Sequence, residues 1–226
     1  MPVPGFPEVR PGDRLASLIA QHAQLEQGDV VVVTQKVVSK AEGRLVEVDA
    51  EDPAAVAALV ESQARRVLRR RGELTVTETT HGFVCANAGV DLSNVRRGWA
   101  ALLPLDSDRS ARRIRDGLAA TAGVRVGVVV SDTFGRTWRR GVTDVAIGVA
   151  GVAAVVDLRG TPDALGRELR ATEVCVADEL ASAAELVKGK GSGVPVVVVR
   201  GVDPTWLRES SVAGEITRPY GEDLFR

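Results

Sequence analysis

The residues with the clearest chemical potential are Ser131, Asp132 and Thr133, which follow the apolar run 124–130. That run predicts a buried central strand, and ligand sites in open α/β sheets favour the carboxyl ends of such strands. A carboxylate beside a hydroxyl suits Mg²⁺ or Mn²⁺, because both ions prefer hard oxygen ligands. Ser, Asp and Thr are also ordinary turn residues, so the triplet alone fits a metal site and a capped turn equally well.

A basic loop follows this triplet at residues 135–141. Three arginines, Arg136, Arg139 and Arg140, flank Trp138 between two glycines. Guanidinium groups match the oxygen geometry of phosphates and carboxylates. This loop therefore favours a functional site over a simple turn at residues 131–133. We assign the three arginines to the binding of an anionic substrate because of their charge. A solvated basic loop is the alternative.

A second carboxylate comes from residues 89–95, which follow a predicted strand and contain Asp91 and Asn94. If Asp91 and Asp132 converge, two carboxylates and a hydroxyl would be available for one or two metal ions. Taken alone, this segment is common turn chemistry, so its signal is weak.

Two lysine-bearing segments are candidate phosphate sites. Residues 34–43 place Lys36 and Lys40 directly after an apolar strand, where their charge would attract phosphate, although an exposed helical turn fits the spacing better. Residues 188–193 alternate lysine with glycine, which lets backbone N–H groups approach an anion; a flexible connection fits equally well. No GxxxxGK[ST] motif is present, so neither segment is a P-loop.

Several elements would position these residues. Apolar side chains at helical spacing predict helices over 13–25, 108–122 and 172–188. Residues 29–34 and 194–199 are apolar on both faces, which indicates central strands.

The middle of the chain adds a helix that we expect to open at Asp52 and to end near Gly72, with a basic run at residues 65–71 as its solvated end. Strands at 74–79 and 82–86 follow without a helix between them, which implies an antiparallel pair. The sequence therefore predicts a mixed α/β (α+β) fold with antiparallel pairs and packed helices, rather than a doubly wound Rossmann sheet.

The composition bounds the class of protein. The 226 residues of the chain, residues 1–226, are expected to form a single domain of one or two lobes without a clear boundary in the sequence. A net charge of -1 gives no sign of a nucleic-acid partner, and no apolar run approaches the ~20 residues of a membrane span. Cys85 and Cys175 are far apart, which predicts free thiols and a cytoplasmic protein. With two histidines, a zinc site is not expected.

Taken together, seven segments in chain order resemble the coenzyme F420:L-glutamate ligase family. They cover nearly the whole chain, and their common order makes the resemblance specific although each alone is modest. The segments are residues 5–13, 28–44, 89–94, 131–136, 138–141, 147–151 and 177–179.

The resemblance implies a GTP-dependent ligase that needs Mg²⁺ or Mn²⁺. It would join L-glutamate to the lactyl carboxylate of the deazaflavin precursor, coenzyme F420-0, and add further γ-linked glutamates. It also implies an unusual mixed α/β fold and an intertwined homodimer. Some actinobacterial relatives carry a second, flavin-binding domain, and this chain resembles the stand-alone form or the ligase domain alone.

The resemblance also assigns residues. Those that would lie against GTP are Phe6, Pro7, Glu8, Val9, Gln35, Lys36, Lys40, Asn94, Gly189, Lys190 and Gly191, and those that would bind the metal are Asp91, Asp132 and Thr133. Many relatives carry glutamine where this chain has Lys190. A charged lysine cannot ligate a metal, so no metal role is expected for Lys190, whereas a contact with phosphate is compatible with its charge.

The implied chemistry suits these residue types. GTP would phosphorylate the carboxylate, and the amine of glutamate would attack the resulting acyl phosphate, with Asp132 and Lys40 as the principal catalytic groups. Phosphoryl transfer of this kind needs alignment and neutralised charge. Two other functions remain open: a metal-dependent phosphohydrolase, which needs no amine acceptor, and a non-catalytic regulator that binds the nucleotide without turnover.

Overall fold

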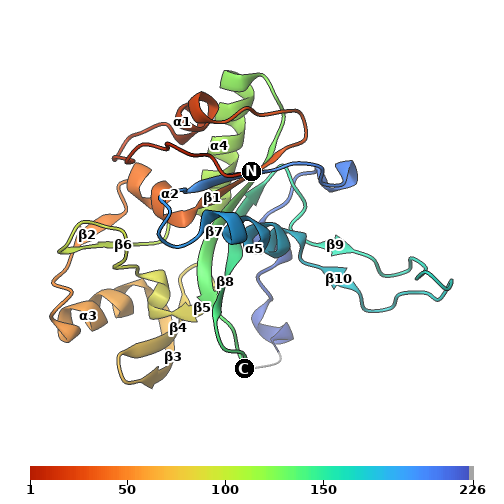
Figure 1. Ribbon diagram of the computed structural model, residues 1–226. Coiled ribbons are helices and arrows are strands. Elements are labelled where there is room, and N and C mark those ends of the chain that lie inside the picture. The colour runs from red at the N-terminus through yellow and green to blue at the C-terminus, as the bar shows by residue number, and fades with distance from the viewer. Residues whose placement is uncertain (224–226) are drawn as a thin grey trace.

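The valines that follow Asp29 lie at the centre of the molecule. They form strand β1 (Val30–Thr34), which pairs in parallel with β7 (Gly127–Gly135) and antiparallel with β11 (Val196–Val199). Strand β8 (Val142–Ala150) is antiparallel to β7, so the sheet order is β11-β1-β7-β8. The computed structural model describes residues 1–223, and Figure 1 shows this sheet surrounded by helices.

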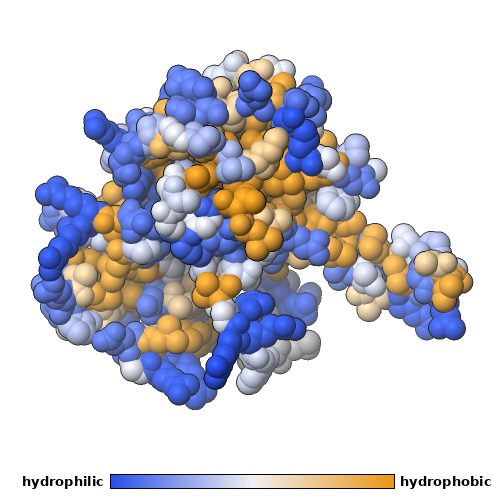
Figure 2. All heavy atoms as spheres, in the orientation of Figure 1, coloured by the Kyte–Doolittle hydropathy of each residue, from blue (hydrophilic) through white to orange (hydrophobic). Residues whose placement is uncertain are grey.

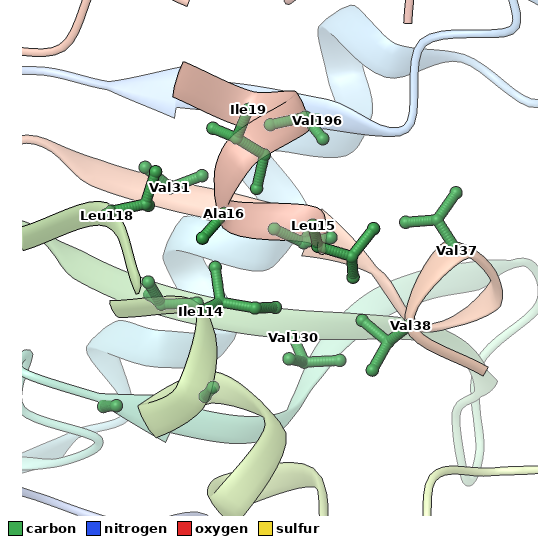
Figure 3. Close-up of a cluster of buried hydrophobic side chains, with 14 of the residues drawn as sticks. Leu15, Ala16, Ile19, Val31, Val37, Val38, Ile114, Leu118, Val130 and Val196 are labelled. Carbon is green, nitrogen blue, oxygen red and sulfur yellow. The ribbon is translucent and has the colours of Figure 1, made fainter. Parts of the chain in front are cut away.

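Helices cover both faces of the sheet, which explains why its strands are apolar on both sides. The first face packs on α1 (Leu15–His22), α2 (Gln35–Ala41) and α4 (Ser107–Ala122), and Figure 3 shows the buried side chains between them. The second face packs on α5 (Val176–Lys188) and the short α6 (Val212–Glu215).

Smaller sheets surround the central one. The first is an antiparallel sheet of β3 (Ala64–Arg71), β4 (Leu74–Thr79) and β5 (Val84–Ala86), which follows helix α3 (Pro53–Gln63). The second is the pair of β2 (Leu45–Glu47) and β6 (Trp99–Ala101). The predicted mixed fold with antiparallel pairs is confirmed.

Two strands form a projecting hairpin. Strands β9 (Val156–Asp157) and β10 (Glu173–Val174) are antiparallel, and the chain that joins them extends away from the rest of the molecule in Figures 1 and 2. The remaining elements are single turns of 3-10 helix: η1 (Asn87–Gly89), η2 (Pro204–Trp206) and η3 (Tyr220–Glu222). Within residues 1–223, no helix is both long enough and apolar enough to cross a bilayer.

The expected helix from Asp52 to Gly72 is wrong in its second half. Helix α3 ends at Gln63, and the arginine run lies on strand β3, where it pairs with β4. Arg66 Nε is 2.9 Å from Glu78 Oε2 across this pair. The apolar spacing continues past Gln63, but pairing with a distant strand overrides it. The basic residues therefore do not act on a helix dipole.

The Ser131–Thr133 triplet was expected to follow the end of its strand, and this too is wrong. Strand β7 continues through it to Gly135, because β8 supplies partners for every residue of this stretch, including Asp144 opposite Thr133. The register shifts between Val130 and Ser131, and such a bulge changes the direction of the following side chains.

Two other boundaries differ from expectation. Helix α5 begins at Val176, not near residue 172, because Glu173 and Val174 pair with β9. Helix α1 covers a shorter stretch than the expected 13–25.

Candidate active site

A cavity of about 740 Å³ lies where β1 and β7 end beside the loop that follows α5. Every residue that the resemblance assigns to nucleotide or metal lines it, although their places in the chain span almost 190 positions. The cavity brings together Phe6, Pro7, Glu8, Val9, Gln35, Lys36, Lys40, Asp91, Asn94, Asp132, Thr133, Gly189, Lys190 and Gly191.

The parallel pairing of β1 with β7 explains much of this convergence. Thr34 lies opposite Ser131, so helix α2, which starts at the next residue, begins beside Asp132. At the other edge, the backbone N–H of Val3 donates to Val196 O at 2.9 Å, which directs residues 6–9 along the cavity.

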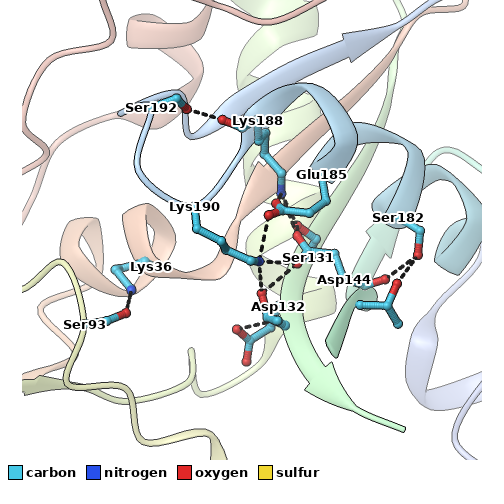
Figure 4. Close-up of polar contacts among 12 residues, drawn as sticks. Lys36, Ser93, Ser131, Asp132, Asp144, Ser182, Glu185, Lys188, Lys190 and Ser192 are labelled. Carbon is cyan, nitrogen blue, oxygen red and sulfur yellow. Dashed lines mark hydrogen bonds and ion pairs between the residues drawn. The ribbon is translucent and has the colours of Figure 1, made fainter. Parts of the chain in front are cut away.

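Helix α2 supplies two lysines with different surroundings. Lys36 Nζ is 2.7 Å from Asp91 Oδ2 and donates to Ser93 Oγ at 2.8 Å, the latter contact being drawn in Figure 4. Lys40 is buried and pairs with the exposed carboxylate of Glu8 at 2.5 Å. The side-chain amide of Gln35, by contrast, points into the protein, where it donates to Ser39 Oγ and Leu102 O.

The two candidate metal-binding carboxylates are electrostatically different. Burial acts to raise the pKa of Asp91, but the hydrogen bond and charge of Lys36 outweigh it and hold this pKa below its usual value. Burial raises the pKa of Asp132 to about 7; the Thr133 N–H opposes this rise, and the negative charges of Asp91 and Asp144 add to it. Its hydrogen bond from Thr133 N is 2.8 Å long.

A buried ion pair beside the triplet was missed in the sequence. Lys188 Nζ, at the end of α5, lies 2.7 Å from Asp144 Oδ2 and donates to Ser131 Oγ at 2.9 Å. Both charged side chains are almost completely buried. Asp144 is a single carboxylate in the apolar strand β8, and that isolation was the one signal that could have identified it.

Lys190 approaches the same carboxylate from the loop. Its Nζ lies 2.6 Å from Thr133 Oγ1, 2.8 Å from Glu185 Oε1 and 3.1 Å from Asp144 Oδ1 (Figure 4). Burial acts to raise the pKa of Asp144, but the hydrogen bonds from Lys188 and Thr133 lower it to about 2. Burial acts to lower the pKa of Lys190, and its bonds to Glu185 and Asp144 raise it above its usual value.

All lysines of this chain lie at the cavity. Its four lysines are Lys36, Lys40, Lys188 and Lys190, and all four line the cavity. The other basic residues with fixed charge are arginines, and none in the described part of the chain lines it. A lysine ammonium is a compact point charge with three donors, which suits phosphate groups and buried carboxylates of irregular geometry.

The three arginines of the basic loop do not line the cavity. Arg136, Arg139 and Arg140 are exposed at the end of the β7–β8 hairpin, where Arg136 Nη2 donates to Arg140 O at 2.8 Å. Trp138 between them is 88% exposed. Their assignment to an anionic substrate stays a prediction.

The carboxylates at the cavity fit a metal site completed by phosphate and water better than a site made by protein ligands alone. Within residues 1–223, no group of three or more His, Cys, Asp or Glu is arranged to hold a metal. The charge of Asp91 nevertheless contributes to the raised pKa of Asp132, and both carboxylates line the cavity. Mg²⁺ often takes one or two protein carboxylates and completes its shell with substrate phosphates and water. These residues fit a metal that binds together with a phosphate ligand.

Comparison with known proteins identifies relatives along the full chain. Residues 5–201 match the model of the family described as F420-0:Gamma-glutamyl ligase. The coenzyme F420:L-glutamate ligase of Methanopyrus kandleri is 44% identical over 242 residues, covering 100% of this chain and 96% of the relative. The enzymes of the same description from Archaeoglobus fulgidus and Methanothermobacter thermautotrophicus are 42% and 40% identical, over 100% and 99% of this chain and 95% and 97% of theirs.

Proposed function

Since this chain belongs to the F420-0:gamma-glutamyl ligase family, we propose that it joins L-glutamate to the lactyl carboxylate of coenzyme F420-0 at the expense of GTP. The observation that supports the GTP site is the convergence of all fourteen assigned nucleotide and metal residues on one cavity. Addition of further glutamates through γ-linkages is part of the same proposal.

The cavity has the positive and negative side chains that binding of a nucleoside triphosphate with its metal ion requires. Lys36 and Lys40 on α2 and Lys190 on the opposite loop would face the phosphates. Asp91 and Asp132 would hold Mg²⁺ or Mn²⁺, which when bound would draw charge from the phosphate oxygens. Thr133, the third residue assigned to the metal, contacts Lys190 instead.

The proposed reaction has two steps. The γ-phosphoryl group passes from GTP to the lactyl carboxylate, which forms an acyl phosphate and GDP. The amine of L-glutamate then attacks the acyl carbon, and phosphate leaves as the amide forms. The protein contributes alignment and positive charge, because phosphoryl transfer requires little covalent help. We assign Lys40 to the neutralisation of negative charge on the phosphoryl group during its transfer.

One assay tests the proposed function. The protein is incubated with coenzyme F420-0, GTP, L-glutamate and Mn²⁺, and the products are examined by mass spectrometry. We expect a product heavier by one glutamate residue or more, together with GDP. Phosphate release without an amide product would indicate a phosphohydrolase instead, and bound but unchanged GTP would indicate a regulator.

Lys40→Ala is expected to weaken GTP binding by roughly 10- to 100-fold, the value of one charged hydrogen bond. The reason is that Lys40 is buried at the cavity wall, where Glu8 is its one ion-pair partner within residues 1–223 and its ammonium is available to phosphate. Calorimetric titration with GTP measures the effect. Arg113→Ala, which removes one positive charge from the exposed side of α4, is the matched control, and equal affinities of the two variants would refute the assignment.

The proposal includes a homodimer. Its support is the family resemblance together with the projecting β9–β10 hairpin, whose connecting chain exposes 85% of Leu165. Light scattering of the purified protein tests it, because a dimer has twice the 23.9 kDa mass of one chain.

A further inference from the structure

The ammonium of Lys190 lies inside a cage of three oxygens. We call Thr133, Asp144 and Glu185 the oxygen cage, because Thr133 Oγ1, Asp144 Oδ1 and Glu185 Oε1 lie 2.6, 3.1 and 2.8 Å from Lys190 Nζ. Figure 4 shows Lys190 reaching from its loop towards Glu185 and Asp144. The Lys190 side chain is 59% exposed, so its position follows from these charged contacts more than from packing.

The oxygen cage is held in place by the fold. The Thr133 hydroxyl donates to Asp144 Oδ1 at 2.7 Å across the β7–β8 pair. Lys188 engages the other oxygen of Asp144 at 2.7 Å and lies 3.5 Å from Glu185. Two carboxylates and a hydroxyl are therefore fixed within reach of a single cation before any ligand binds.

These three ligands are the type that a divalent metal prefers. Carboxylate and hydroxyl oxygens are hard donors, and Mg²⁺ and Mn²⁺ select them. In this chain an ammonium already satisfies the same oxygens. A metal ion would have to displace Lys190 from two ion pairs in order to enter.

We propose that Lys190 is a built-in cation, whose ammonium takes the place of a divalent metal ion in the oxygen cage. The oxygen cage therefore binds no metal in this protein, and Thr133 contacts a lysine where the family resemblance assigns it a metal. Lys190 keeps a positive charge beside the cavity at every metal concentration. Its significance for catalysis rests on the proposed function, but its test by metal binding does not.

The test counts Mn²⁺ ions bound to Lys190→Gln and to the unaltered protein in the absence of nucleotide, by the electron paramagnetic resonance signal of free Mn²⁺. Glutamine has similar reach, removes the charge and offers an amide oxygen as a further ligand. We expect Lys190→Gln to bind one more Mn²⁺ per chain than the unaltered protein. Lys190→Arg keeps the charge and is expected to gain none.

Two variants separate the oxygen cage from a general change in charge. Lys40→Gln removes the same charge from the same cavity without contact to the cage, so it should gain no Mn²⁺ site. Lys190→Gln combined with Asp144→Asn loses a cage carboxylate and should lose the additional ion. Circular dichroism confirms that each variant is folded.

The outcomes are distinct. Equal Mn²⁺ numbers for the unaltered protein and Lys190→Gln would overturn the proposal, and so would an equal gain in Lys40→Gln. If the unaltered protein binds no Mn²⁺ without nucleotide but Lys190→Gln binds one, the built-in cation is supported, and Asp91 and Asp132 are left to a metal that binds together with phosphate. In glutamylation assays, Lys190→Gln should also show a steeper dependence on Mn²⁺ concentration than Lys190→Arg.

Discussion

Asp132→Asn is expected to lower glutamylation by about a thousandfold or more, the scale of losing a principal electrostatic group in an active site, while the protein becomes more stable to heat. The loss follows because the amide cannot hold a metal beside the phosphates as a carboxylate does. Initial rates with GTP, L-glutamate and Mn²⁺ measure this effect. Near-normal turnover would show that Asp132 has no metal role.

The gain in stability follows from the raised pKa of Asp132. Burial raises this pKa from 3.8 to about 7, so the folded protein holds the proton more tightly than the unfolded chain does. The free energy of unfolding therefore falls as the pH rises from about 4 to about 7. The full difference corresponds to about 4 kcal/mol at most, and the partial opening of Asp132 to the cavity reduces it.

We therefore expect the melting temperature of Asp132→Asn at pH 8, without metal or nucleotide, to exceed that of the unaltered protein by a few degrees, roughly 2–4 °C per kcal/mol. At pH 4 the difference should vanish, because Asp132 is then protonated. Glu73→Gln, which removes a carboxylate from the exposed turn between β3 and β4, should show no such pH-dependent gain. A gain of the same size at both pH values would contradict the raised pKa.

Lys188→Met is expected to destabilise the protein by roughly 3–5 kcal/mol, the usual result of removing one partner of a buried ion pair. The ammonium of Lys188 satisfies both Asp144 and Ser131, and all three side chains are almost completely buried. Without it, Asp144 retains Lys190 as a cationic partner, on one oxygen only. Urea unfolding monitored by circular dichroism measures the loss.

A double-mutant cycle tests the cause of that loss. Asp144→Asn in the Lys188→Met background removes the carboxylate charge that has lost its buried partner, so the double variant should be more stable than Lys188→Met alone. The lowered pKa of Asp144 sets a pH window as well: its stabilising contribution is complete above about pH 4 and is lost as the pH falls towards 2. Additive effects of the two substitutions would show that the ion pair is not the source.

The central sheet and most helices could be predicted because their signals are local. The valines of β1 and β11 are apolar on both faces, and α4 carries a clear helical spacing with Asp106 at its N-cap. The stretch 64–71 was misread because its apolar residues also fit a helix, and only pairing with β4 decides between the two.

The site was predictable in part. Its assigned residues came from the resemblance to a family, not from the pattern of any one segment. Asp144, and its ion pair with Lys188, were missed because the pair joins positions 44 residues apart, and a lysine at a helix end is usually solvated. No local pattern reports that the cross-strand register places Asp144 beside Thr133, or that the end of α5 brings Lys188 to Asp144 and Ser131.

The restriction of lysine to the cavity makes the protein's chemistry towards amine reagents unusual. Reductive methylation with labelled formaldehyde would place side-chain probes only at the cavity, on lysines such as the exposed Lys190 rather than the buried Lys188, and on the α-amino group of Met1, which donates to Val198 O. An NMR spectrum of such a sample would report on the site with almost no background. Coupling to a solid support through amines, in contrast, would attach the protein by the surface that its substrates need to reach.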